Sequence, residues 1–110
     1  MLLDCKSAQL ENLVAIELVR RYGMENVFYF ENNVEIDFYV PDEKLAIQVS
    51  LQVLDCLDTR ERETKAFVKL HNFIPESNCL IITNSEEASI ECDGIPISVL
   101  PAWKWLLETP

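Results

Sequence analysis

Polar residues alternate along two short segments and could form a site for metal-dependent chemistry. Glu35 and Asp37 stand two positions apart in "VEIDFYV", and Gln48 and Ser50 do so in "LAIQVSL". A carboxylate such as that of Asp37 is the ligand type that Mg²⁺ prefers. A second carboxylate and a lysine beside it would hold the ion and orient a water molecule. The chain offers an amide and a hydroxyl instead, so the chemistry expected of this segment is in question.

The apolar residues between these polar ones predict how the two segments pair. Alternation predicts strands over residues 34–40 and 44–51, with Val34, Ile36, Phe38 and Val40 on one face of the first. An antiparallel hairpin with coincident apolar faces pairs Val40 with Leu45, Phe38 with Ile47 and Ile36 with Val49. Asp37 then lies opposite Gln48, and Glu35 opposite Ser50, with Cβ atoms about 5 Å apart. A solvated polar face without function is the simpler interpretation of the same pattern.

The remaining elements follow from periodicity and from turn residues. Apolar spacing predicts a helix from Ser7 to about Tyr22, ended by Gly23, and a second from Asp58 or Thr59 to Ile74. The other expected elements are a strand over 27–31, a turn at Asn32-Asn33, a buried strand over 79–84, an acidic loop over 85–94, a short edge strand containing Pro96, and a terminal helix opened by Pro101. This order predicts an α/β fold around one mixed sheet. In the terminal helix, Trp103 is expected in the core, and Trp105 is not assigned.

Composition limits the classes of function. The chain has 110 residues, which suits a single domain, and a net charge of −10. A surface that grips nucleic acid is normally basic, so this charge disfavours DNA and favours a protein partner. No segment resembles a signal peptide or a membrane span, which predicts a cytoplasmic protein. With only Gly23 and Gly94 there is no glycine-rich phosphate loop, so ATP binding is not expected.

The cysteines do not form a recognisable metal motif. Cys5, Cys56, Cys79 and Cys92 are far apart, and His71 is the only histidine. We therefore expect free thiols in a reducing compartment and no zinc site, with disulfides as the less favoured alternative.

Several blocks together resemble a known family. They are "QLENLVAIELVRRYG", "FYFENNVEIDFYVPDEKLAIQVS", "TRERETKAFVKL", "CLIITNSEE" and "ISVLPAWKWLLE". They are similar to the uncharacterised C-terminal domain of a bacterial and archaeal group of AAA-type ATPases, and more distantly to the PD-(D/E)XK nuclease superfamily. The resemblance covers nearly all of residues 1–110. It implies a restriction endonuclease-like αβββαβ core, with one extra edge strand and a short C-terminal helix, and an AAA-type ATPase as partner in cis or in trans.

The resemblance also assigns site residues one by one. Glu11 matches the helical glutamate, Asp37 the metal-binding aspartate, Gln48 the second acid and Ser50 the lysine. The first two fit the motif and the last two do not. A neutral amide and a hydroxyl bind Mg²⁺ and support the transition state weakly, so the resemblance implies a degenerate, inactive site without a cofactor.

Two rescues of activity stay open. Glu35 could supply an anion from across the hairpin, and Lys65, on a stripe with Arg62 and Lys69, could replace the lost lysine. In that case Glu11, Asp37 and Gln48 would hold Mg²⁺ or Mn²⁺, and the chain would be a DNA endonuclease. The favoured hypothesis, in contrast, is an inactive accessory or regulatory module of an ATPase. Membrane partners are not expected, and a homo-oligomer is left open.

Overall fold

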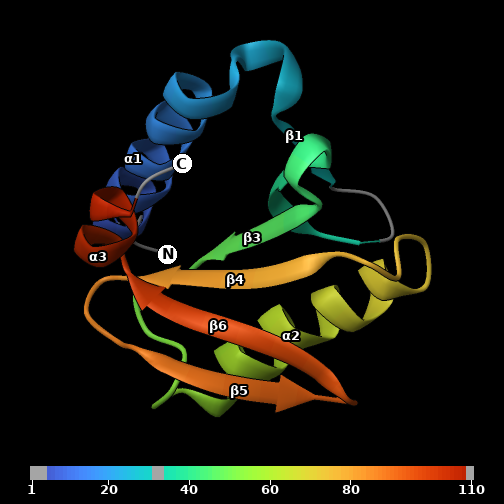
Figure 1. Ribbon diagram of the computed structural model, residues 1–110. Helices are drawn as coiled ribbons and strands as arrows, with labels where there is room; N and C mark the ends of the chain where they lie inside the picture. The colour runs from blue at the N-terminus through green and yellow to red at the C-terminus, as the bar shows by residue number, and fades with distance from the viewer. Residues whose placement is uncertain (1–4, 31–33, 109–110) are drawn as a thin grey trace.

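The computed structural model describes residues 5–30 and 34–108 of the chain, which form a six-stranded sheet with helices on both faces (Figure 1). The elements in chain order are α1 (Cys5–Tyr22), η1 (Met24–Asn26), β1 (Phe28–Phe30), β2 (Ile36–Val40), η2 (Pro41–Glu43), β3 (Leu45–Val49), α2 (Leu57–His71), β4 (Asn78–Thr83), β5 (Ala88–Cys92), β6 (Ile95–Pro101) and α3 (Ala102–Leu107). The predicted α/β class is confirmed. The turn predicted at Asn32-Asn33 lies outside the described residues.

The sheet is mixed, as the sequence predicts. Its strand order is β1-β2-β3-β4-β6-β5. The first three strands are antiparallel to one another, β3, β4 and β6 are parallel, and β5 pairs antiparallel with β6. The three parallel strands at the centre are therefore flanked by antiparallel strands, β1 and β2 on one side and β5 on the other.

Helices cover both faces of the central strands. Phe67 and Leu70 of α2 pack in one core cluster with Ile81 of β4, and Val14 of α1 packs in the other with Ile82. Figure 1 shows α1 and α3 on one side of the sheet and α2 on the other. A strand covered on both faces needs apolar residues at successive positions, which explains the continuous run "CLIIT" in β4.

The predicted register of the β2–β3 hairpin is confirmed at its turn end. Val40 pairs with Leu45, Tyr39 with Ala46 and Phe38 with Ile47. The prediction that Val34 and Ile36 share a face with Phe38 is wrong. Val34 and Ile36 pack in the cluster beneath α2, whereas Phe38 and Val40 pack with the cluster beneath α1. The alternation of β2 therefore breaks beside Asp37. The register of β1 on β2 also shifts in this region, between the pair Phe28–Tyr39 and the pair Phe30–Ile36.

Two expectations about the C-terminal half are also wrong. Residues 85–94 are not only an acidic loop, because Ala88–Cys92 form β5, whose Ile90 and Cys92 pack against the core beneath α2. The strand with Pro96 is not at the edge, because β6 lies between β4 and β5. Proline is tolerated there because the ladder with β4 begins at Ile97, one residue after the missing amide. Two strands, β5 and β6, therefore follow β4 in the chain, where one was expected.

Both long helices begin earlier than their predicted caps. α1 already contains Cys5, so Ser7 lies inside its first turn, and Cys56 precedes α2, so Asp58 lies inside that helix. The end of α1 is as predicted, because Gly23 adopts a φ of 90°, which favours glycine.

The tryptophan expected in the core is the wrong one. Trp105 is 3% exposed and Trp103 is 59% exposed. Ala102 and Trp105 are three positions apart in α3 and therefore lie on the same face of the helix, which is the buried one. Arg21 of α1 lies over the Trp105 ring, 4.6 Å from its centroid, and donates a hydrogen bond to the Trp105 carbonyl.

Within the described residues, no helix combines the length and the apolar character needed to cross a lipid bilayer.

Candidate carboxylate site

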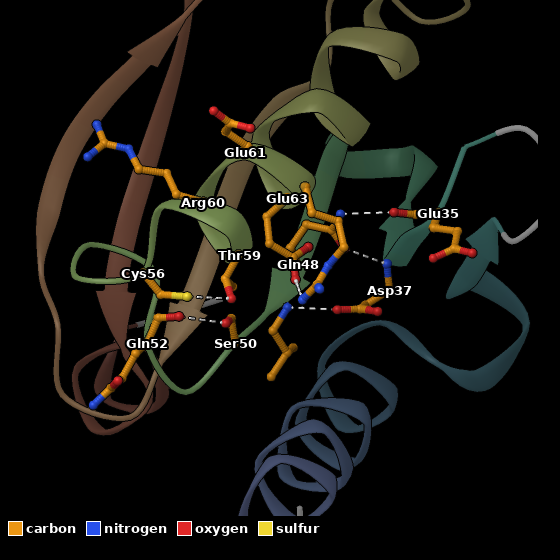
Figure 2. Close-up of polar contacts among 12 residues, drawn as sticks. Glu35, Asp37, Gln48, Ser50, Gln52, Cys56, Thr59, Arg60, Glu61 and Glu63 are labelled. Carbon is orange, nitrogen blue, oxygen red and sulfur yellow. Dashed lines mark hydrogen bonds and ion pairs between the residues drawn. The ribbon is translucent and has the colours of Figure 1, made fainter. Parts of the chain in front are cut away.

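A small pocket of about 220 Å³ lies where α1, the β2–β3 hairpin and α2 meet. Its polar lining comprises Glu11, Glu35, Asp37, Gln48, Arg62 and Glu63. The structure thus brings together three of the predicted site residues, Glu11, Asp37 and Gln48, and adds the predicted rescue residue Glu35. Figure 2 shows Glu35, Asp37 and Gln48 in one group beside Glu63.

Gln48 bridges the two strands of the hairpin with its side chain. It is only 2% exposed. Its Oε1 accepts a hydrogen bond from the backbone N–H of Asp37 at 3.0 Å, and its Nε2 donates to the carbonyl oxygen of Glu35 at 2.9 Å. The amide therefore takes over strand-to-strand hydrogen bonding beside the break in β2. A carboxylate could accept the first bond but could not donate the second.

Asp37 makes the reciprocal bridge in the other direction. Its Oδ2 accepts a hydrogen bond from the N–H of Val49 at 2.8 Å. Burial raises the pKa of Asp37 to about 6; the Val49 hydrogen bond opposes this rise, and the charges of Glu11 and Glu35 add to it. The carboxyl group thus sits in surroundings that disfavour its charged form.

Glu63 is a member of the site that sequence reasoning missed. It is buried on α2, and its pKa is raised to about 7 by burial and then by the charge of Asp37. Arg62 Nη2 lies 3.8 Å from Glu63 Oε1 and opposes the shift. The signal was present in the sequence, because Glu63 precedes Ala66, Phe67 and Leu70 at helical spacing and so shares their buried face.

Ser50 and Lys65 do not line this pocket. Ser50 is buried, its Oγ donates to the carbonyl of Gln52 at 2.9 Å, and its backbone N–H bonds to Ile82 of β4. Lys65 is exposed on α2. The cation that lines the pocket is instead Arg62, from the same basic stripe of the helix.

Two of the side chains that the resemblance assigns to a Mg²⁺ site are engaged in hydrogen bonds with the backbone. At the position of the second acid, the Gln48 oxygen already accepts a backbone hydrogen bond, and so does Asp37 Oδ2. Across residues 5–30 and 34–108, no group of three or more His, Cys, Asp or Glu side chains is arranged to hold a metal ion.

Cys56, Cys79 and Cys92 are free thiols. No model of a known protein family matches the chain, and no curated protein or solved structure shows significant similarity to it.

Proposed function

We propose that this chain is a nuclease-fold accessory domain without nuclease chemistry, which assists or regulates an AAA-type ATPase in cis or in trans. The observation that carries the proposal is the buried Gln48 amide. It stands at the position of the motif's second carboxylate, and both of its polar ends are bonded to the backbone of β2. The residue is thus used for structure where an enzyme would place a metal ligand.

The order of elements supports the fold part of the proposal. The chain runs α1, β1, β2, β3, α2, β4, which is the αβββαβ order implied by the resemblance. β5, β6 and α3 extend this order at the C-terminal side. The restriction endonuclease-like core is therefore part of what we propose.

The charges of the pocket also favour an inactive site. Four carboxyl side chains line it with Arg62 as the cation beside them. A phosphate backbone would meet net negative charge unless a metal ion intervened. The side chain of Ser50, in the place of the motif's lysine, does not line the pocket and bonds to its own loop.

A protein partner suits the rest of the surface. The chain as a whole carries a charge of −10. Exposed apolar side chains stand on the two helices of one face, including Ile16 of α1 and Trp103 and Leu107 of α3. Aromatic residues such as Trp103 are enriched at surfaces that another protein covers.

One observation favours the alternative, a Mg²⁺-dependent DNA endonuclease with a rearranged site. Glu63 joins Asp37 and Glu11 in the pocket from a different element and could replace the acid lost at Gln48. Arg62 would then take the part for which Lys65 was considered.

A cleavage assay separates the two functions. We expect no cleavage of single- or double-stranded DNA with Mg²⁺ or Mn²⁺, and identical traces for the wild type, Asp37→Ala and Glu63→Gln. Metal-dependent cleavage that is lost in Asp37→Ala would contradict the proposal. Its loss in Glu63→Gln as well would assign the relocated carboxylate to the site.

A further inference from the structure

A second and larger cavity lies beside the carboxylate pocket. Its volume is about 520 Å³, within the range of small-molecule sites. It lies beyond the C-terminal ends of the parallel strands β3 and β4, where Ser50 and Asn84 follow those strands, and at the beginnings of α1 and α2. In Figure 2, Ser50, Gln52, Cys56 and Thr59 gather on this side, away from Glu35 and Asp37. Ligands commonly bind at this edge of α/β sheets.

The charged side chains that line this cavity are Lys6 and Arg62, both cations. This is notable in a chain with a net charge of −10. Asp55 and Asp58, on either side of Cys56 in the sequence, do not line the cavity. The other lining groups include the side chains of Asn84 and Ser85, which can donate hydrogen bonds to an anion.

The wall of the cavity is held in place by the fold. The segment after β3 stays attached to β4 through hydrogen bonds from Ser50 N–H to Ile82 and from Asn84 N–H to Leu51. Further along the segment, the Glu86 carboxylate accepts hydrogen bonds from the N–H groups of Val53 and Leu54 at 2.6 and 3.0 Å. The part of the cavity wall that follows β3 is therefore positioned before any ligand arrives.

We propose that this cavity binds the phosphate group of a small phosphorylated molecule, with Lys6 and Arg62 as its charge partners. A guanidinium can hold two phosphate oxygens at once, and an ammonium adds a point charge. The volume leaves room for a molecule attached to the phosphate. The site shares Arg62 with the carboxylate pocket, where Arg62 lies 3.8 Å from Glu63, but it uses neither Asp37 nor Gln48, so it does not rest on the proposed accessory role.

Cys56 provides a built-in reporter for the test. It is an exposed thiol that lines the cavity, and its hydrogen bond with Thr59 lowers its pKa, which favours alkylation. Cys79 is buried and burial raises its pKa to about 12, which disfavours its reaction. The rate of Cys56 alkylation by iodoacetamide, followed by peptide mass spectrometry, would be measured with inorganic phosphate, AMP or adenosine, and with NaCl at matched ionic strength.

We expect phosphate or AMP to slow Cys56 alkylation saturably, with no effect of adenosine or NaCl. Arg62→Ala and Lys6→Ala should each weaken this protection roughly tenfold or more, as expected for the loss of a charge-assisted hydrogen bond. Lys69→Ala, an exposed cation on the same helix, should leave it unchanged. Both substituted residues are exposed, so the variants should fold, which circular dichroism would check.

Stronger protection by AMP than by phosphate would assign a phosphomonoester as the ligand class, and equal protection would assign free phosphate. The proposal is overturned if phosphate and AMP give no saturable protection, or if protection persists unchanged in both cavity variants. Equal protection by adenosine or NaCl would overturn it as well.

Discussion

Gln48→Ala is expected to lower the free energy of unfolding by about 2–4 kcal/mol. The substitution deletes the bridge between β2 and β3, leaving the Asp37 N–H and the Glu35 carbonyl without their partner, and it opens space where the side chain is 2% exposed. For a domain of this size the melting temperature should fall by about 10–15 °C. Urea unfolding followed by circular dichroism measures the effect.

Gln52→Ala is the matched control, because Gln52 is an exposed glutamine a few residues further along the same segment. Its free energy of unfolding should change by no more than about 0.5 kcal/mol. If Gln48→Ala were as mild as Gln52→Ala, the amide would not be a structural bridge, and Gln48 would be available as a metal ligand. Gln48→Glu should also destabilise, and more at pH 8 than at pH 5, because it adds a buried acid to the pocket.

Glu63→Gln is expected to stabilise the protein at pH 8, by about 2 kcal/mol. The pKa of Glu63 is about 7, above its ordinary value of 4.5. Between these two values the folded chain binds more protons than the unfolded chain, so stability falls as the pH rises through this window. Asp37, with a pKa of about 6, ionises first, and its charge then opposes ionisation of Glu63. Glutamine mimics the neutral form and removes the penalty.

At pH 4 the same substitution should have little effect, because Glu63 is then mostly protonated in both states. Thermal unfolding of both proteins from pH 4 to pH 8 therefore gives curves that diverge as the pH rises. Glu61→Gln, an exposed glutamate on the same helix, should not reproduce the divergence. A stability that is independent of pH in the wild type would show that the carboxyl groups of the pocket are hydrated and ionised freely.

The sequence predicts the fold wherever apolar spacing is regular. The register of the β2–β3 hairpin follows from strict alternation near its turn, and the buried position of β4 follows from its uninterrupted apolar run. The strand β5 was missed because the acids around it resemble a loop, although Ala88, Ile90 and Cys92 alternate. The central position of β6 was missed because a proline usually marks an edge. The sequence does not show that the ladder between β6 and β4 begins at Ile97, one residue after Pro96.

The sequence predicted which residues form the candidate site better than it predicted what their side chains bind. The register places Asp37 beside Gln48, as the hydrogen bonds of both side chains require. That these side chains bind backbone groups could not be predicted, since it depends on the break in β2 that turns Val34 and Ile36 toward α2. The spacing of Ala66, Phe67 and Leu70 indicates that Glu63 is on the buried face of its helix, but only the fold shows that it lies beside Asp37.

The position of β4 at the centre of the sheet has a consequence for the order of folding. The hairpins β2–β3 and β5–β6 join strands that are close in sequence, and such contacts form early. β4 is not joined to either of its pairing partners by a tight turn. The helix α2 separates it from β3 in the sequence, and β5 separates it from β6. Closing these longer loops costs more entropy before any pairing is gained. The two hairpins should therefore assemble as local units, and docking of β4 between them should set the folding rate.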